Sequence, residues 1–360
     1  TSGLHALRSL NQTLSVPVMT ADINRTVHGW FGLAAIASAA ITSFSPNRGV
    51  SVPLRGNVFR TSFFYGFQPL FTVAVLLAWW ALPTRSDAPL ETAAILLLVA
   101  NLAIYALEHV TPDRADWVTD ASDRKTDAFW VAVRVFIFGP VLQVLMVLSI
   151  EPILNSLNFP TLWPSSWPLF ARIVLALVVA ELVAFAVHVA MHRVPILWRY
   201  HATHHAQTKL TSARWASSHP IEIATVQLPI FLLVTVLGPE LVDIAGAIIL
   251  GRVTVIIAHS NLRLSSTPIG WLLTTPDLHR RHHMLGAKNQ ANFGDVLLVF
   301  DRVFGSFSRQ EALRVGIGSG QKIGLRDQLR LRGIVMGSID TEISIDLSDT
   351  VTPPVENTNR

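Results

Sequence analysis

Long apolar runs constrain the fold of this chain more than any other feature of its sequence. Six of them approach or exceed the roughly 20 residues that cross the hydrocarbon core of a bilayer. They lie at 66–82, 91–107, 127–150, 168–191, 222–237 and 240–258. Only 14% of the 360 residues are charged, against about 25% in ordinary soluble domains. The sequence therefore predicts an all-α integral membrane protein, because a helix satisfies its own backbone polar groups within lipid.

Hydropathy divides the chain into three parts. An N-terminal segment, 1–65, contains a shorter apolar run at 30–44 that fits either an interfacial helix or a short transmembrane helix. A membrane domain follows at 66–308. The rest, 309–360, suits a cytoplasmic C-terminal tail whose polar end frays. The first residues do not show the pattern of a cleavable signal peptide.

The basic residues of the loops predict the orientation in the membrane. They recur before 66, at 108–126 and at 192–221, whereas the alternate loops carry only Arg85. By the positive-inside rule, the loop at 192–221 and everything after 258 are cytoplasmic. We expect a bacterial inner membrane as the location. Because the basic residues are dispersed, the net charge of +4 does not indicate nucleic-acid binding.

Three histidine clusters stand out in this apolar chain. They are His188-Val-Ala-Met-His192, His201-Ala-Thr-His204-His205 and His279-Arg-Arg-His282-His283. On a helix, residues three and four apart share a face, so each cluster presents its imidazoles together. All three clusters lie near the predicted boundary between membrane and cytosol. Eight nitrogen donors exceed the four that a zinc ion takes, and therefore predict two metal ions.

The nature of the metal follows from the donors and their surroundings. Cysteine is absent, which excludes disulfides, iron–sulfur clusters and thiolate zinc sites. Imidazole suits zinc, copper, iron and nickel equally well. A site that faces hydrocarbon suggests a substrate with unactivated C–H bonds, whose oxidation needs a redox metal and dioxygen. We therefore predict two iron ions with O2, and expect that zinc can replace iron in purified protein.

The motifs around the clusters carry a family resemblance. The three clusters are followed by Asn292-Phe293-Gly294 and by the sequence FDRVFGS at 300–306. With this spacing, residues 107–307 resemble the fatty acid hydroxylase / sterol desaturase superfamily of membrane di-iron oxygenases. The stretch 269–276 is similar to the alkylglycerol monooxygenase branch, and 218–222 is similar to the sterol C5-desaturase branch.

The resemblance implies a helical membrane anchor with a cytoplasmic helical cap that holds two irons. Members hydroxylate, desaturate or cleave ethers of lipids, with electrons from a ferredoxin or cytochrome b5. No cytochrome b5 segment is present, so the implied donor is a separate protein. The implied metal ligands are His188, His192, His201, His204, His205, His259, His279, His282 and His283. Some members carry a further histidine where this chain has Arg263; His219 is the candidate substitute, although a His-Pro pair also suits a helix start.

Two further residues are candidate catalytic groups. Glu181 lies seven residues before His188 and could orient an imidazole, or pair with Arg134 or Arg172. Asn292 belongs to the family-like motif and also suits a turn.

The predicted function is oxygen-dependent hydroxylation of a lipid or other hydrophobic substrate. Desaturation or ether cleavage by the same site is the alternative. Two functional classes without oxygen chemistry are further alternatives: a membrane metal transporter and a non-catalytic membrane protein. A metal transporter would carry its ligands near the middle of the bilayer, and a non-catalytic member would have lost histidines from the clusters.

Overall fold

The computed structural model describes residues 58–149, 151–157, 162–286 and 291–331. Within these ranges the chain forms helices and no β-strand, apart from two isolated bridges. The apolar run predicted at 30–44 and the polar end of the tail lie outside the described residues. The described part is an all-α membrane protein, as predicted.

Six helical segments are long and apolar enough to cross a membrane. Five are single helices: α3 (Val58–Ala81), α5 (Pro89–Val110), α9 (Leu169–Arg193), α11 (Pro220–Leu237) and α12 (Leu241–His259). The sixth joins α6 (Ala121–Ala132) to α7 (Gly139–Ser149) through the π-helix η2 (Val133–Phe138). Their positions match the six predicted apolar runs, because each run must satisfy its own backbone hydrogen bonds in lipid.

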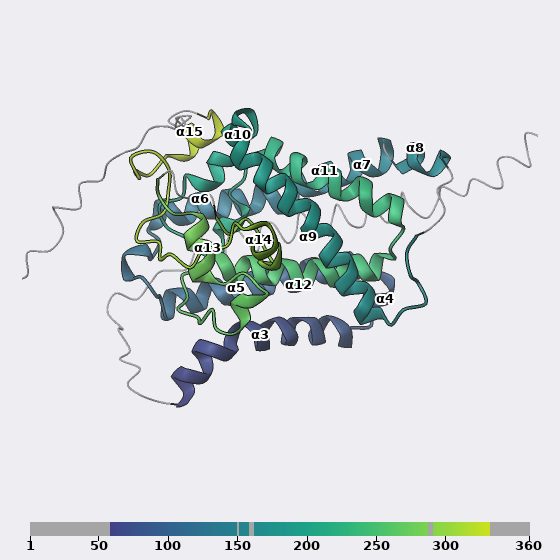
Figure 1. Ribbon diagram of the computed structural model, residues 1–360, viewed down its shortest axis with the longest axis horizontal. Helices are drawn as coiled ribbons and strands as arrows, with labels where there is room; N and C mark the ends of the chain where they lie inside the picture. The colour runs from purple at the N-terminus through teal and green to yellow at the C-terminus, as the bar shows by residue number, and fades with distance from the viewer. Residues whose placement is uncertain (1–57, 150, 158–161, 287–290, 332–360) are drawn as a thin grey trace, which may run out of the picture.

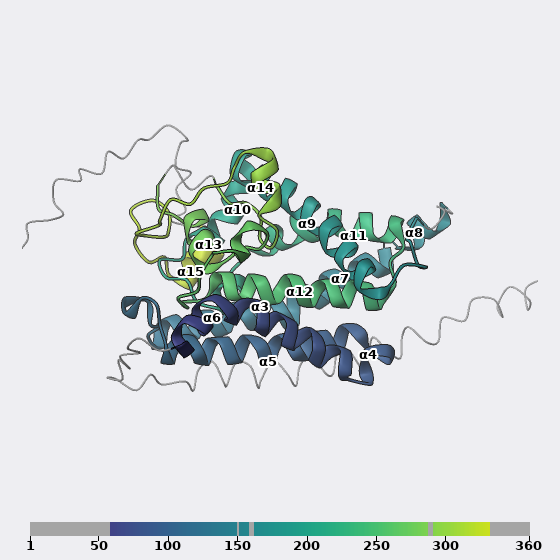
Figure 2. The same ribbon diagram turned by 60° about the horizontal axis from the view of Figure 1, so that its bottom comes forward.

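Helix α12 is the centre of the membrane domain. It packs most extensively against α5 and α9 and also contacts α3 (Figures 1 and 2). Two small residues allow α9 to approach it closely. A side chain at Gly246 would collide with Ile173, and one at Gly251 would press on Leu177. Small residues serve this purpose between membrane helices, where packing rather than water drives association.

Shorter elements form a cap at one end of the membrane helices. The cap contains α10 (Pro195–His205), η3 (Arg214–Ala216), η4 (Ile269–Trp271), α13 (Pro276–His282) and α14 (Val299–Phe304). The remaining short elements are α4 (Thr84–Asp87), η1 (Ala115–Trp117), α8 (Glu151–Ser156) and α15 (Leu325–Leu329). Helices α4 and α8 lie at the end opposite to α13 (Figure 1). Both α9 and α12 end at the cap, so their last turns face the same space.

Residues 309–331 pack onto the cap. The Leu285 N–H donates to the carbonyl of Arg314, and the Gly316 N–H donates to the carbonyl of His283. The Arg114 guanidinium donates to the carbonyls of Ala312 and Leu313. The first part of the predicted tail is therefore folded against the third histidine cluster.

Candidate metal centre

Nine histidines from four helices and the C-cap of one of them converge in two buried groups. The five-histidine group contains His188, His192, His201, His205 and His282, and the four-histidine group contains His204, His259, His279 and His283. One potential ligand nitrogen of each residue lies within 4.8 Å of those of the other members of its group. The second and third clusters each supply residues to both groups, because the adjacent histidines of an H-x-x-H-H motif point to different sides of their helix. The two groups therefore share a wall made of α10 and α13.

The elements that carry the histidines explain this convergence. His188 and His192 lie in the last turns of α9, while His259 is the last residue of α12. Helices α10 and α13 both begin with a proline at their first positions, which fixes where each short helix starts relative to the membrane helices. The three clusters and His259 thus meet at one end of the membrane domain.

The nitrogen spacing in the five-histidine group suits a metal. Nε2 of His201 lies 3.0 Å from Nε2 of His188 and 3.1 Å from Nε2 of both His192 and His205. Metal–nitrogen bonds of about 2.1 Å that meet at right angles place neighbouring nitrogens about 3.0 Å apart. Nε2 of His282 is buried and has no hydrogen-bond partner among the described residues. These donors fit one metal ion bound by the histidine nitrogens of this group.

The four-histidine group has a similar spacing. Nε2 of His259 lies 3.0 Å from Nε2 of His279 and 3.3 Å from Nε2 of His204. Nε2 of His283 lies 3.2 Å from Nε2 of His279. Two metal ions, one in each group, therefore fit the donor set, and the nitrogen chemistry alone does not choose between iron and zinc.

Backbone carbonyls orient several of the rings through Nδ1. Nδ1 of His188 lies 2.6 Å from the carbonyl oxygen of Phe293, and Nδ1 of His282 lies 3.0 Å from that of Ala291. Nδ1 of His259 lies 2.8 Å from the carbonyl oxygen of Val255. A carbonyl accepts but does not donate, so each contact places the ring proton on Nδ1 and leaves Nε2 with its lone pair.

A carboxylate, and not a backbone carbonyl, orients the ring of His201 through Nδ1. Oε1 of Glu222, a buried residue of α11, lies 3.0 Å from Nδ1 of His201 and accepts a hydrogen bond from the Ser218 hydroxyl at 3.2 Å. Carboxylates paired in this way fix the ring and increase the basicity of the ligating nitrogen. Sequence reasoning did not select Glu222 as a site residue. Its signal was an acidic residue at the start of an apolar run, immediately after the second cluster.

Several cap histidines are electrically neutral at neutral pH. Burial lowers the pKa of five of them well below the usual value, and the charges of neighbouring imidazoles lower it further. These five are His204, His205, His279, His282 and His283. A neutral imidazole is the form that binds a metal, so the folded chain holds these donors ready.

His219 and Arg263 do not join either group. Nδ1 of His219 accepts a hydrogen bond from the Ile221 N–H at 3.2 Å, and its ring packs against Tyr200. His219 is therefore the N-cap of α11, which is the helix-start role that its Pro neighbour suggested. Arg263 is exposed. The structure thus assembles nine of the ten histidines that the sequence proposed as ligands.

Glu181 forms a hydrogen bond with the loop beside the five-histidine group. Its carboxylate accepts a hydrogen bond from the Val296 N–H at 3.1 Å. Arg172, one of its two expected partners, instead pairs with Glu240 and Asp243. Among the described residues, Glu181 forms no hydrogen bond or ion pair with Arg134 or with a histidine ring; its partner is the backbone that follows Asp295.

Asn292 fixes the same loop from its other end. It has a positive φ of 55°, and its side-chain amide donates to the carbonyls of Leu278 and Ser308. Asp301 accepts hydrogen bonds from the N–H groups of Phe293 and Gly294, both at 2.7 Å. Burial raises the pKa of the Asp301 carboxyl. The loop held in this way presents the carbonyls that orient His188 and His282.

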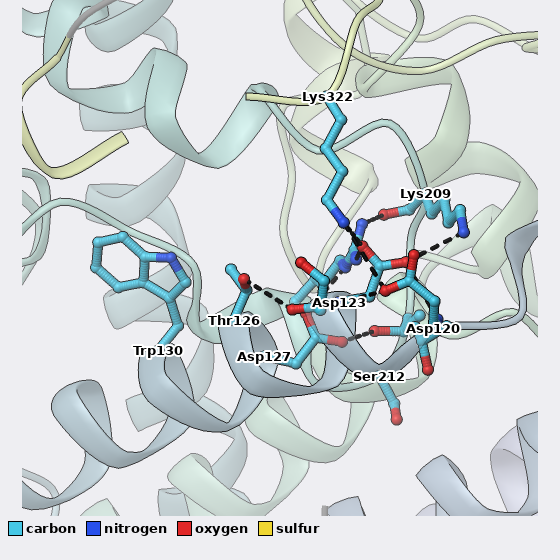
Figure 3. A network of polar contacts seen from close by, with 12 residues as sticks. Asp120, Asp123, Thr126, Asp127, Trp130, Lys209, Ser212 and Lys322 are labelled. Carbon is cyan, nitrogen blue, oxygen red and sulfur yellow. Dashed lines mark hydrogen bonds and ion pairs between the residues drawn. The ribbon is translucent and has the colours of Figure 1, made fainter. Parts of the chain in front are cut away.

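A buried ion-pair network holds the loop after the second cluster. The Arg214 guanidinium lies 3.0 Å from carboxylate oxygens of both Asp123 and Asp127 on α6. Figure 3 shows Lys209 and Lys322 reaching Asp123 from different directions, at 3.1 and 2.7 Å. Lys322 belongs to the segment that covers the cap, so the network joins that segment, α6 and the loop into one unit.

The comparison with protein families identifies this region. The profile of the family described as Fatty acid hydroxylase matches residues 173–306. The matched part begins within α9 and ends just after α14, so it includes all nine histidines of the two groups. Over these residues the chain is similar to the fatty acid hydroxylase family, which confirms the resemblance of its motifs.

Two characterised proteins are similar to parts of the chain. Ornithine lipid hydroxylase OlsE from Rhizobium tropici is 32% identical over 125 residues, which cover 33% of this chain and 37% of that protein. Fatty acid hydroxylase vlmA from Lecanicillium sp is 29% identical over 152 residues, which cover 38% of this chain and 42% of that protein. The chain thus spans about two fifths of the length of these relatives. No solved structure matches it.

Proposed function

We propose that this protein is a membrane-bound oxygenase that hydroxylates a C–H bond of a lipid. In the balanced reaction, substrate, O2, two electrons and two protons give the hydroxylated lipid and water. The observation that carries the proposal is the pair of buried imidazole groups at one end of six apolar helices. The names of the two relatives, an ornithine lipid hydroxylase and a fatty acid hydroxylase, support a lipid as the substrate class.

We assign one iron to each histidine group. Bound iron supplies the activation of dioxygen that an unactivated C–H bond requires. The chain gathers nine imidazoles, orients several of their rings through carbonyls and Glu222, and excludes bulk water by burial. Phe293, which packs against His188, His192 and His282, gives the site an apolar wall. Electrons come from a separate ferredoxin or cytochrome b5 type donor.

In this proposal Glu181 and Asn292 act as positioning residues. Both hold the loop whose carbonyls meet His188 and His282, and neither forms a hydrogen bond with a ligand nitrogen among the described residues. His219 is left out of the proposed ligand set because it caps α11.

Because the sequence contains no cysteine, a single introduced cysteine can show which side of the membrane its position faces. We propose that the cap faces the cytoplasm and that the membrane is a bacterial inner membrane. Ser319 lies on the cap segment and Ser166 lies before α9 at the opposite end, and both are exposed. Ser319→Cys should react with an impermeant maleimide only in inverted vesicles, and Ser166→Cys only in right-side-out cells. The reverse pattern would refute the cytoplasmic assignment.

Lipid chemistry tests the activity itself. Purified protein is loaded with iron and supplied with a reduced ferredoxin, membrane lipid and isotopically labelled O2. A product that gains one labelled oxygen atom supports hydroxylation. A product that only loses two hydrogen atoms would instead establish desaturation. Turnover without oxygen would refute both, and would favour a metal-transport or structural role.

The same assay separates the ligands from their neighbours. His204→Ala should abolish oxygen incorporation while the protein still inserts into the membrane, because the change removes no apolar surface. Arg263→Ala is the matched control, since this exposed residue lies near the end of α12 without touching either group. Equal activity of wild type and His204→Ala would contradict the proposal.

A further inference from the structure

Two arginines lie within the membrane-spanning segments close to the metal centre. Arg134 is in the π-helix η2, and Arg252 is in α12. Both guanidinium groups stack on the ring of Trp215, with their central carbons 5.2 and 5.6 Å from its centroid. A charged residue inside a membrane span is expensive and is a candidate functional group by default. π-Helical turns also occur frequently at functional sites.

Neither arginine has a counter-ion among the described residues. Three buried arginines are paired: Arg172 with Glu240 and Asp243, Arg214 with Asp123 and Asp127, and Arg280 with Asp113. Among the described residues, Arg134 and Arg252 form no ion pair or side-chain hydrogen bond, and both contact Trp215.

The acidic groups nearest to this cluster are engaged elsewhere. The charges of Glu222 and Asp295 act on Arg134, and the charges of Glu181 and Arg252 act on each other. Glu222 is bound to His201 and Ser218. Glu181 accepts from the Val296 N–H, and Asp295 lies 3.5 Å from Nδ1 of His188. None of them comes within ion-pair distance of either guanidinium.

Trp215 adds a third donor to the cluster. Its Nε1–H is buried and has no hydrogen-bond partner among the described residues. A buried donor without an acceptor is costly. The two guanidinium groups beside it also repel each other. One anionic group that binds both guanidinium groups and the indole N–H would relieve all three penalties.

The cluster is also placed to direct a substrate to the metal centre. Trp215 lies two residues before Ser217, whose carbonyl oxygen is 3.3 Å from Nδ1 of His204. Arg252 precedes His259 by seven residues on α12, which is about 10 Å along a helix. An anion held here lies beside the four-histidine group and within the apolar part of the protein.

The geometry points to Arg134, Arg252 and Trp215 as the binding site for the anionic group of an amphiphilic lipid, a carboxylate or a phosphate. This inference rests on the proposed lipid hydroxylation and specifies its substrate: a lipid with an anionic group, whose hydrocarbon chain extends toward the histidines. Arginine suits this role because its planar fork binds carboxylate and phosphate oxygens in pairs.

Binding to the wild-type protein tests the inference without turnover. The full chain, loaded with zinc and kept in a neutral detergent without oxygen or reductant, is titrated calorimetrically with three amphiphiles of equal chain length. These are hexadecanoate, hexadecyl phosphate and hexadecanol. At least one anion should bind about tenfold or more tightly than the alcohol, which is the effect of one hydrogen bond to a charged group. Selectivity between the two anions identifies the head group, and equal binding of all three overturns the inference.

Variants locate the anion site. Arg134→Gln and Arg252→Gln should each reduce anion affinity about tenfold and leave hexadecanol binding unchanged. Trp215→Phe keeps the ring and removes the N–H, so it should cause a smaller loss. Arg85→Gln is the matched control, because Arg85 stacks on Trp80 at 4.2 Å but lies at the opposite end of the membrane domain.

The outcomes separate this inference from the proposed function. Unchanged anion binding in both arginine variants would overturn it, because bound zinc would then explain the selectivity. If those variants fail to fold, the comparison of the three amphiphiles and Trp215→Phe still decides the question. No reductant or oxygen is present, so failure of hydroxylation in the separate assay leaves this result unaffected.

Discussion

The two ends of the membrane domain treat buried charge in opposite ways. At the end away from the cap, Arg172 pairs with Glu240 at 2.6 Å and with Asp243 at 3.3 Å, and the Trp163 indole N–H donates to Asp243. We call these four residues the Arg172 cluster. At the cap end, besides the paired Arg214, nine histidines gather their ring nitrogens in two groups, and Arg134 and Arg252 have no counter-ion among the described residues.

The Arg172 cluster contains charges that stabilise the fold, whereas the histidines, Arg134 and Arg252 at the cap end are groups that can bind a ligand. The Arg172 cluster satisfies its own charges and joins α9 to the start of α12, so it needs no other molecule. The cap end gathers donors and cations whose stabilisation depends on a metal or an anion. Changes at the two ends should therefore have different effects, and the following predictions run from the largest expected effect on the metal centre to the smallest.

Loss of a ligand at the centre of the five-histidine group should be the most damaging change. Nε2 of His201 contacts three other ligand nitrogens, so His201→Ala should remove one metal from each chain and reduce oxygen incorporation by more than about 100-fold. Metal analysis of the purified protein and the labelled-oxygen assay measure the two effects. Two tightly bound metals in this variant would contradict the ligand assignment.

Removal of the carboxylate behind His201 should have the next largest effect. Glu222→Gln keeps the size and the hydrogen bond to the Ser218 hydroxyl but removes the negative charge, so metal affinity should fall about 10–100-fold. Competition with a chelator measures that affinity. Glu222→Asp, which restores the charge on a shorter side chain, should recover part of it. An unchanged affinity in Glu222→Gln would show that the contact is only structural.

Acid should lower the folding stability of the metal-free protein, because the buried histidines of the cap resist protonation in the folded state. The pKa values of His204, His205, His279, His282 and His283 are lowered in the folded chain. Below about 6.5, the ordinary pKa of histidine, the unfolded chain therefore binds more protons than the folded one. The metal-free protein should have its full stability above that pH and lose stability as the pH falls.

Thermal unfolding of the metal-free protein between neutral and mildly acidic pH measures this slope. His279→Gln removes one of the five groups and should make the slope shallower. A stability that rises as the pH decreases would show that the imidazoles are protonated in the folded state.

The smallest effect on the metal centre should follow a change in the Arg172 cluster. Asp243 is fully buried, and Asp243→Ala leaves Arg172 and the Trp163 N–H without their buried acceptor. The free energy of unfolding should decrease by about 1–3 kcal/mol, because the Trp163 N–H loses its buried acceptor and Arg172 keeps only the more exposed carboxylate of Glu240. Metal content of the protein that does fold should not change. A loss of metal equal to that in His201→Ala would show that the two ends are coupled.

Much of the fold and of the metal centre could be predicted from local sequence patterns. Apolar runs long enough to span a bilayer must form helices there, so the six membrane segments follow from hydropathy. Histidines three and four residues apart must share a helical face, so the clusters predicted convergent ligands. His259 lacked such spacing and came from the family resemblance, and the structure brings it into the four-histidine group.

The remaining site residues depend on contacts between distant segments. Glu222 and His201 are separated by a loop that folds back, and Arg134 and Arg252 meet only because both helices pack around Trp215. His219 was the candidate substitute for the histidine that some family members carry where this chain has Arg263. Its ring turns to cap α11 instead, a choice that spacing alone does not reveal.

The sequence by itself determined that this chain is an α-helical membrane protein with clustered nitrogen donors, because hydropathy and helical periodicity are local properties. Only the tertiary structure decided how nine histidines divide into groups of five and four, which carbonyls and carboxylate orient them, and which charges remain unpaired. These features arise where α9, α10, α12 and α13 meet. Helix packing, and not any single segment, sets the distances between their side chains.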